Sequence, residues 1–269
     1  MINRPIAAHS MQRCTRYLAV ICVVVGLTGC FRAPHFTPTG VLQDEDVSRA
    51  VCHALPTIER GSLRAFRALL DTTIVTPMSE SVSFRYAVVA KQPDDLRVDL
   101  LPTEGAYTLG LLVVRGSSAL VIDAQQRSYS VDSDSKRLFS SFFGLEGITP
   151  EIIKALIVGE LSQVMCSHVT VYRVSDERVQ VVDMQRRYAW EVDVRTGRVH
   201  RVLLLDESLT KVQAEASRSF APGEETVKIS MYKPVAASAT MQIRKFVLNP
   251  EISPTLFEVA PPQGYREQR

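Results

Sequence analysis

One helical stretch, residues 135–165, interrupts a chain whose sequence otherwise shows strand patterns. It reads SKRLFSSFFGLEGITPEIIKALIVGELSQVM. Thr149-Pro150-Glu151 is a typical helix start, because Thr can cap, Pro suits the first helical position and Glu suits the positive helix end. Gly159 can end the same helix. Apolar side chains recur at helical spacing in both halves of the stretch, as Leu138/Phe142, Phe139/Phe143, Ile152/Leu156 and Ile153/Ile157. The sequence therefore predicts two short, apolar helices here.

Short strand patterns flank this stretch on both sides. Residues 81–90 and 187–194 alternate apolar and polar side chains, and the second run places Tyr188 and Trp190 on one face. We count roughly 11 or more such strands, joined by short turns without a βαβ rhythm, which indicates a mainly β fold built on one antiparallel sheet. Twist accumulates across a sheet this wide, so we expect it to curl into an unclosed β-barrel with the helices on its concave side.

Two roles for the helices agree with this pattern. They could plug the sheet and complete its hydrophobic core, as apolar helical stripes commonly do. They could instead form a lid, at about residues 135–165, over an apolar cavity. A further helix is predicted at 44–55, with an apolar side made of Val47, Ala50, Val51 and Ala54.

The amino terminus has the features of a secretory signal. Arg13 and Arg16 precede the apolar run LAVICVVVG at 18–26, and no acidic residue occurs before position 30. A membrane span needs about 20 apolar residues, so the run is too short to be one. Translation from Met11 instead of Met1 would give a more compact signal.

The apolar run ends in Leu27-Thr28-Gly29-Cys30, which resembles the bacterial lipobox. The resemblance implies cleavage before Cys30 and acylation of its thiol, and acyl chains of this kind anchor a protein without a span. In lipoproteins of two-membrane bacteria an Asp after the Cys usually means retention in the inner membrane. Phe31 stands there, so we expect the outer membrane, on its periplasmic face. The expected organisation is a signal peptide at 1–29, a lipidated Cys and tether at 30–43, and a folded domain at 44–265.

Two cysteines, Cys52 and Cys166, remain once the signal is removed and Cys30 is acylated. In an exported protein they could form a disulfide, or they could stay as buried free thiols. The cysteines and scattered histidines have no metal-ligand spacing, so we expect no metal.

The charge and motif content argue against several function classes. Three arginines precede position 30 with no acidic counterpart, so their loss takes the formal net charge from +2 to −1. A near-neutral chain gives no electrostatic case for nucleic-acid binding. The sequence has no Gly-x-Ser-x-Gly, His-Glu-x-x-His or phosphate-binding glycine loop. We therefore expect a protein that is not an enzyme and needs no cofactor.

The carboxy-terminal segment 248–265, LNPEISPTLFEVAPPQGY, resembles that of the LolA/LolB lipoprotein-carrier superfamily. Residues 96–131 are also similar to it, with a strand, a loop through Pro102 and Gly105, and a hairpin ending in Tyr129-Ser130-Val131. The resemblance extends over about residues 60–265. It implies an unclosed β-barrel covered by α-helices, with an apolar cavity that receives acyl chains.

The lipobox makes the chain more similar to LolB, a lipoprotein of the outer membrane, than to soluble LolA. The resemblance implies binding and transfer of acyl chains or lipidated proteins, with the membrane, lipoproteins and a periplasmic carrier protein as partners. LolB inserts an apolar residue from a protruding loop into the membrane. The corresponding loop here, 102–107, lacks a Leu at its tip, and Tyr107 is the best substitute.

Candidate residues for the cavity wall come from the helices and from strand faces that we expect to point inward. They are Phe84, Tyr86, Leu100, Leu111, Val113, Leu138, Phe142, Phe143, Ile153, Leu156, Ile157 and Trp190. A shift of one residue in register would reverse any of the strand assignments.

A second hypothesis is a non-enzymatic adaptor of the cell envelope, whose interior is filled by its own side chains. Cavity volume separates the two, because a lipid site needs an empty apolar space of several hundred Å³. An enzyme acting on lipid or glycan is the third hypothesis, and it would require a polar cluster with perturbed pKa values.

Overall fold

One sheet, antiparallel except at its edge pair β7–β15 and curled around two helices, organises the domain in this computed structural model. The structure describes residues 33–55, 63–75, 81–104, 107–143, 149–159, 168–220, 225–232 and 237–268. The helices are α2 (Glu45–Ala54), α3 (Ser135–Phe143) and α4 (Pro150–Val158), with a 3₁₀ turn, η3 (Pro254–Phe257). The strands are β1 (Val41–Leu42), β2 (Ala65–Val75), β3 (Ser81–Lys91), β4 (Asp95–Pro102), β5 (Gly110–Arg115), β6 (Ser118–Asp123), β7 (Ser128–Asp132), β8 (Val169–Arg173), β9 (Arg178–Asp183), β10 (Tyr188–Asp193), β11 (Val199–Leu205), β12 (Val212–Ser219), β13 (Thr226–Met231), β14 (Ala237–Leu248) and β15 (Arg266–Glu267).

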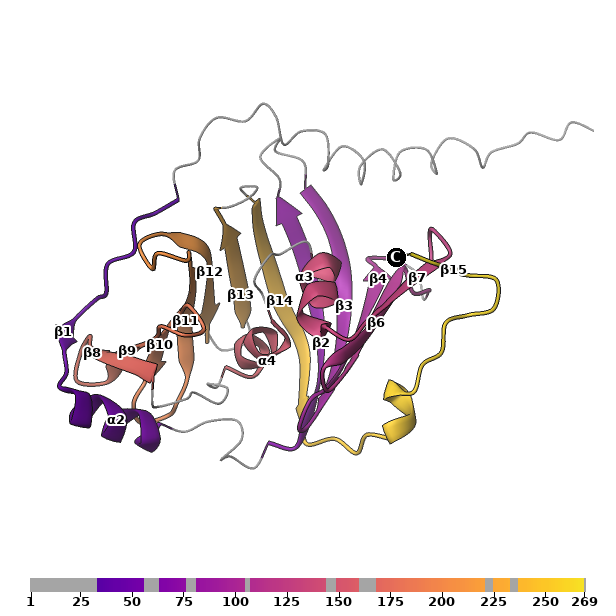
Figure 1. Cartoon of the computed structure of the whole chain (residues 1–269). Coiled ribbons are helices and arrows are strands. Elements are labelled where there is room, and N and C mark those ends of the chain that lie inside the picture. The colour runs from indigo at the N-terminus through magenta and orange to yellow at the C-terminus, as the bar shows by residue number, and fades with distance from the viewer. Residues whose placement is uncertain are drawn as a thin grey trace, which may run out of the picture. The chain divides into compact units, whose positions relative to one another are not determined.

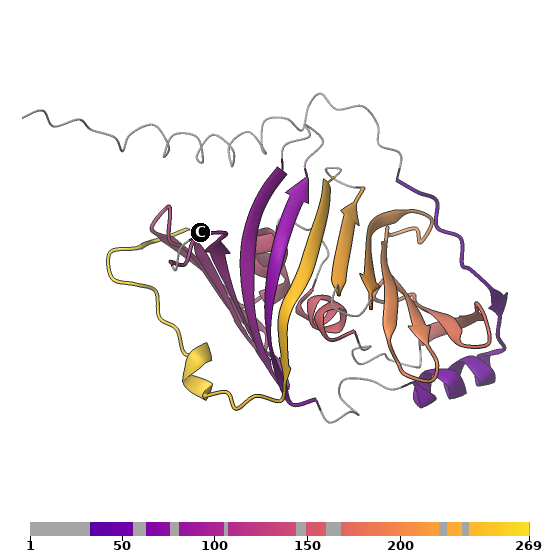
Figure 2. The same ribbon diagram turned by 180° about the vertical axis from the view of Figure 1, so that it is seen from behind.

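The strand order follows the chain in two blocks. Strands β2 to β7 form one meander, β8 to β14 form another, and β14 lies antiparallel to β2 to join them. The sheet stays open between β7 and β8, and the chain that connects those two strands contains α3 and α4. Figure 1 shows both helices on the concave side, and Figure 2 shows β14, β2 and β3 from the opposite side. The predicted mainly β, unclosed and curled sheet is confirmed.

The described sheet has 15 strands, more than the roughly 11 expected. The difference arises partly at the edges, where β1 pairs with β8 and β15 pairs with β7. Each of these strands has two residues. Backbone hydrogen bonds define such short strands, and no side-chain alternation in the sequence reveals them.

The start and end predicted for α4 are confirmed. The side chain of Thr149 accepts a hydrogen bond from the Ile152 amide, and Pro150 occupies the first turn. Gly159 has a φ of 78°, in the left-handed region. A Cβ at Gly159 would lie 2.8 Å from the Phe220 ring, so both the backbone and the packing require glycine.

The hydrophobic core lies on the concave face. Buried side chains from both meanders and from α3 and α4 form one continuous cluster there. Tyr188, Trp190 and Val192 all belong to it, so the face predicted from their alternation is confirmed. Tyr188 and Trp190 pack edge to face with their ring centroids 5.9 Å apart.

Two parts of the convex face are covered by the two ends of the described chain. The carboxy-terminal segment places Ile252 and Phe257 on the outer side chains of β5 and β6. At the other end, Ala33 and Phe36 are buried, and Phe36 packs in a cluster with Val182 and Leu203. The expected tether at 30–43 is therefore wrong over residues 33–42, which belong to the folded domain because Phe36 fills an apolar site on the sheet.

The apolar side predicted for α2 is wrong in part: Val51 packs against the core, but Ala50 and Ala54 are exposed. Val47 is exposed, whereas Ser48 and Cys52 are buried. The reason is the part of the β8 edge that lies beyond its pairing with β1. The Val171 amide donates to Oγ of Ser48 over 3.3 Å, and the Gln43 amide donates to the Val171 carbonyl over 3.0 Å. The helix turns a polar residue inward because backbone groups at a sheet edge need partners.

Candidate functional site: the apolar inner face

The inner face of the sheet changes from packed to accessible along strand β3. At one end Val88 and Ala90 are buried, in the middle Tyr86 is buried, then Phe84 is half-buried, and at the other end Val82 is 48% exposed. These residues share one face because side chains alternate along a strand. The neighbouring strand β2 shows the same change, from buried Leu70, opposite Tyr86, to half-buried Ile74, opposite Val82.

An aromatic group stands where the packed core meets the accessible end. The Tyr86 ring centroid lies 5.0 Å from that of Phe84, 5.2 Å from that of Phe143 and 6.4 Å from that of Phe142. Phe142 and Phe143 come from α3, so the helix and the strand meet through rings. Burial raises the pKa of Tyr86 well above its ordinary value, so its hydroxyl stays neutral.

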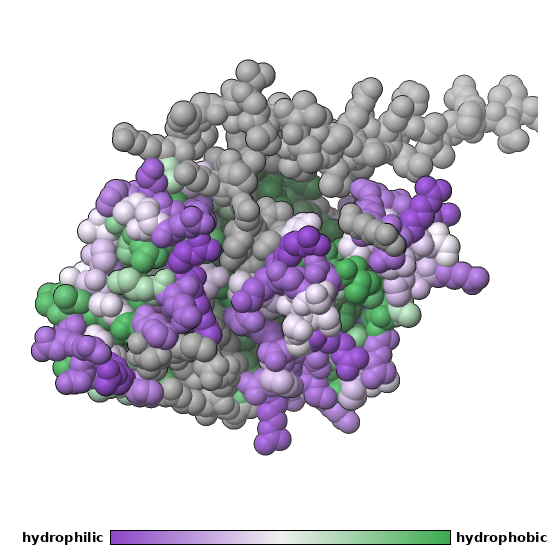
Figure 3. Space-filling view, in the orientation of Figure 1, coloured by the Kyte–Doolittle hydropathy of each residue, from purple (hydrophilic) through white to green (hydrophobic). Residues whose placement is uncertain are grey.

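The molecular surface is hollowed at the accessible end. Figure 3 shows recessed apolar surface there, behind α3 and over the upper ends of β2 and β3 as Figure 1 draws them. Half-buried residues that pack against the core at this end are Ile74, Phe84, Leu100 and Phe142. Because they are apolar and accessible, this hollow is the part of the inner face that is open to an apolar ligand.

Ten of the twelve candidate wall residues lie in the inner-face cluster or pack against it. They are Phe84, Tyr86, Leu100, Leu138, Phe142, Phe143, Ile153, Leu156, Ile157 and Trp190. The α4 residues are almost fully buried, with Leu156 and Ile157 each 1% exposed. These side chains fill space in this conformation instead of lining a void.

The prediction that Leu111 and Val113 line the cavity is wrong, because both residues lie on the opposite face of the sheet. The register pairs Leu112 with Val98, which puts Leu112 inside. Leu111 and Val113 point outward and pack with Ile252 and Phe257. Strand β5 is apolar on both faces because the carboxy-terminal segment covers its outer side, so alternation could not give the orientation.

Arg218 is a buried residue of this site that the sequence analysis missed. Its Nη1 donates to the carbonyl of Leu156 over 2.7 Å and also to the carbonyl of Ile157. Its Nη2 pairs with Glu225, and its guanidinium lies 4.8 Å from the centre of the Phe220 ring. A cation suits a helix end that carries partial negative charge. The signal in the sequence was an arginine in phase with the inward-facing Ala214 and Ala216.

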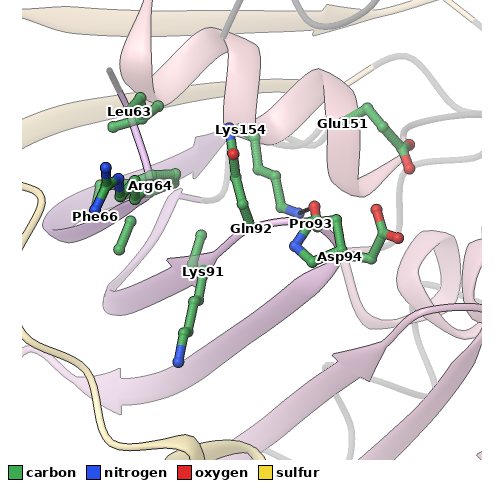
Figure 4. Close-up of a pocket in the computed structure, with 11 residues that line it drawn as sticks. Leu63, Arg64, Phe66, Lys91, Gln92, Pro93, Asp94, Glu151 and Lys154 are labelled. Atoms are coloured by element: carbon green, nitrogen blue, oxygen red, sulfur yellow. Dashed lines mark hydrogen bonds between the residues drawn. The ribbon is translucent and has the colours of Figure 1, made fainter. Parts of the chain in front are cut away.

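A small cavity lies between α4, the start of β2 and the turn that joins β3 to β4 (Figure 4). Its volume is about 140 Å³. Nζ of Lys154 lies 3.5 Å from the carbonyl of Pro93. Burial lowers the pKa of Lys154, and Glu151 and Asp94 oppose that effect. This volume is below the range of ordinary ligand sites, so the cavity does not hold an acyl chain.

Two larger cavities lie elsewhere. One of about 750 Å³ lies beside the contact between α2 and the start of β8, and most of its lining residues are polar, among them Arg49, His168 and Gln185. The other, of about 380 Å³, lies between the outer side of β5 and β6 and the segment that follows Phe257.

The remaining predicted residues are placed as follows. Tyr107 is 61% exposed beside the end of β4. Cys52 takes part in a disulfide. Cys30 and Cys166 lie outside the described residues, so lipidation and the Cys52–Cys166 pair stay predictions. In the described ranges, no helix has the length and hydropathy to cross a membrane. No group of three or more His, Cys, Asp or Glu there could hold a metal ion.

The fold is LolA-like, by comparison with solved structures. No family model matches the sequence, and no curated protein matches it. Several solved structures share the fold, among them the following three. A LolA superfamily protein from Nitrosomonas europaea is 12% identical, with a TM-score of 0.51, and covers 78% of this chain and 96% of its own. A DUF1329 family protein from Desulfovibrio piger is 10% identical, with a TM-score of 0.54 and coverage of 79% and 95%. A putative outer membrane lipoprotein-sorting protein domain from Vibrio parahaemolyticus is 8% identical, with a TM-score of 0.51 and coverage of 79% and 95%.

Proposed function

We propose that this protein binds acyl chains, carried by lipids or lipidated proteins, on the inner face of its sheet. One observation carries the proposal: along β3 the inner face runs from a packed core to accessible apolar residues at one end. Burial is worth about 0.8 kcal/mol per CH₂ group, so such a face can compete with a bilayer for a chain. Two proteins of similar structure, a LolA superfamily protein and a putative outer membrane lipoprotein-sorting protein domain, support the same class of ligand.

The proposal includes a lipid anchor. Acylated Cys30 would hold the protein at the periplasmic face of the outer membrane, and transfer would be of the LolB type, with a periplasmic carrier as partner. Tyr107, exposed at the end of the sheet near the hollow, is the proposed membrane-contacting residue of the β4–β5 loop. Binding and transfer need no covalent chemistry, so the proposed function is not that of an enzyme.

Ligand entry requires the helices to move. Phe139, Leu156 and Ile157 are each 1% exposed or less and occupy the space beneath the sheet. An acyl chain that enters from the hollow must therefore displace α3 or α4. We propose that both helices act as a lid that closes on its own side chains when no ligand is present.

The filled interior supports a second candidate, the envelope adaptor. In that function the helices stay closed, and the protein uses its outer surface. The two functions make opposite predictions for lipid content.

The test is native mass spectrometry of the mature chain from Phe31, exported to a periplasm by the signal of a soluble protein. The expected result is phospholipid or acylated peptide bound at a ratio of about one, the stoichiometry of a single pocket. Phe142→Asp, on the inner face, should lose the ligand. Val131→Asp is the control, because Val131 is 57% exposed and outside the inner-face cluster. A ligand-free mass, together with no uptake from offered phosphatidylethanolamine vesicles, would leave the adaptor as the better account.

A further inference from the structure

Residues 33–42, which we name the N-terminal strap, are fixed to the sheet from their first residue. The carbonyl of Pro34 accepts a hydrogen bond from the Val212 amide over 2.9 Å, and the Phe36 amide donates to the Thr210 carbonyl over 2.7 Å. The backbones of His35 and Lys211 form an isolated antiparallel β-bridge. The strap therefore begins where strand β12 begins, and it holds a set position on the domain.

The strand register shows which end of the sheet this is. The start of β12 lies beside the end of β13, since the Tyr232 amide donates to the Gln213 carbonyl. The end of β13 pairs with the start of β14 through Met231 and Ala237. The start of β14 pairs with the end of β2 through Ser238 and Val75. The strap thus begins at the end of the sheet where β2 stops and β3 starts, as Figures 1 and 2 show.

That end, which we name the rim, is the accessible end of the inner face. Val75 is 41% exposed and Val82 is 48% exposed. Val82 lies on the inner face, and Val75, next to inward-facing Ile74, lies on the outer one. Four strand spacings separate β12 from β3, a width of about 19 Å. Leu248, at the far end of β14, is 55% exposed, so apolar exposure by itself does not distinguish the two ends.

Chain length does distinguish them. Ala33 is buried and comes three positions after Cys30. Three extended residues span at most about 10 Å, and the headgroup layer of a bilayer is itself about 5–8 Å thick. If Cys30 carries acyl chains in the membrane, the start of the strap must lie close to the membrane surface, and this favours the end of the sheet where the strap begins over the far end as the one that meets the bilayer.

We propose that the rim faces the lipid bilayer, with Val75 and Val82 at the membrane surface and the hollow open toward it. This inference depends on the acylation of Cys30 in the proposed function. It gives the domain an orientation, because the strap is a short connection that is fixed to the sheet. An acyl chain could then pass between the bilayer and the inner face without crossing bulk water.

The test is quenching of tryptophan fluorescence by brominated acyl chains. The full chain, with its own signal, is purified and placed in vesicles of phosphatidylethanolamine and phosphatidylglycerol with brominated chains. Val82→Trp and Val75→Trp report on the rim. Leu248→Trp reports on the far end, and Leu42→Trp reports on the exposed apolar residues of β1. Trp190 is 4% exposed and gives the same background in every variant.

Emission from tryptophan at 82 and 75 should be quenched, and emission from tryptophan at 248 and 42 should not be. Equal quenching at all positions, or quenching only at 248 or 42, overturns the orientation. Thermal unfolding checks that each variant folds. If one of the two rim variants does not fold, the other still reports on the rim.

A second variant tests the short connection directly. A Gly/Ser linker of about ten residues, with a mean span of about 17 Å, is inserted between Arg32 and Ala33. Rim quenching should then be lost, and unchanged quenching contradicts the role of the strap. The mass of the intact protein shows whether Cys30 is acylated, and it thereby separates the test of the anchor from the test of the orientation. A chain without acyl groups on Cys30 overturns the anchor and this inference with it, whereas an acylated chain with unquenched rim variants overturns the orientation alone.

Discussion

Arg218 on β12 and Leu156 on α4 are joined by a hydrogen bond of 2.7 Å across 62 positions of sequence. The same guanidinium also reaches the Ile157 carbonyl and pairs with Glu225. Strand β12 thus holds the end of a helix that closes the inner face. The side chain of Arg218 is 3% exposed, so water can replace few of these contacts.

Arg218→Met should lower the free energy of unfolding by about 3 kcal/mol, since removing one partner leaves buried polar groups without hydrogen bonds. The measurement is urea denaturation followed by fluorescence. Arg244→Met is the matched control, because Arg244 pairs with Asp71 but its side chain is 51% exposed. The control should cost less than about 1 kcal/mol. Equal losses in the two variants would contradict the assigned role of Arg218.

Asn249 controls the start of β2. Its Oδ1 accepts from the amides of Arg64 and Ala65 over 2.6 Å and 3.2 Å, and its φ is 48°. Asn249→Ala should therefore lose about 2 kcal/mol, from the hydrogen bonds and from the left-handed backbone. Asn249→Asp keeps the acceptor and should remain near the parent, and Asn249→Gly should fall between them. Urea midpoints give the order, and an Ala variant as stable as the Asp variant would refute it.

Cys52 is disulfide-bonded, and we predict Cys166 as its partner. A tryptic digest without reductant should contain the peptides of Cys52 and Cys166 joined in one mass. The two positions are more than a hundred residues apart, so Cys166→Ser should lose about 2–5 kcal/mol of stability. The pairing is wrong if Cys166 reacts with a thiol reagent in the unreduced, unfolded protein.

Asp193 gives the protein an acid-sensitive turn. The amide of Thr196 donates to its carboxylate over 2.6 Å, and this bond, helped by the Thr196 hydroxyl and the Arg195 amide, lowers the pKa of Asp193 below its ordinary value. A lowered pKa in the folded state adds stability above the unfolded pKa of about 3.9 and removes it as the pH falls through the folded value. Stability should thus decline below about pH 4, and Asp193→Asn should decline less steeply. Parallel pH curves for the two proteins would contradict this.

Local residue patterns predicted much of the fold. Thr149, Pro150 and Gly159 fixed the bounds of α4, because capping and left-handed backbone depend on a few neighbouring residues. The alternation of Tyr188, Trp190 and Val192 gave the correct inner face in the second meander. There the pattern was clear because the intervening Glu191 is polar.

The same reasoning failed where a strand is covered on both sides. Leu111 to Val114 are all apolar, and only the position of the carboxy-terminal segment decides that Leu111 and Val113 point outward. Residues 33–42 contain two prolines and a glycine, which are typical of a tether. These residues are attached to the sheet through the buried ring of Phe36 and through backbone hydrogen bonds to residues 210–212, where β12 begins.

The sequence by itself determined the class of fold, the capped helix between two meanders and the face that Tyr188, Trp190 and Val192 share, because these follow from period, capping and turn chemistry within a few residues. Only the tertiary structure decided that the strap is fixed at the rim, that Arg218 holds α4, and that the inner face is closed at one end and accessible at the other. Those features depend on contacts between residues far apart in the chain, and no local period in the sequence records which distant surfaces meet.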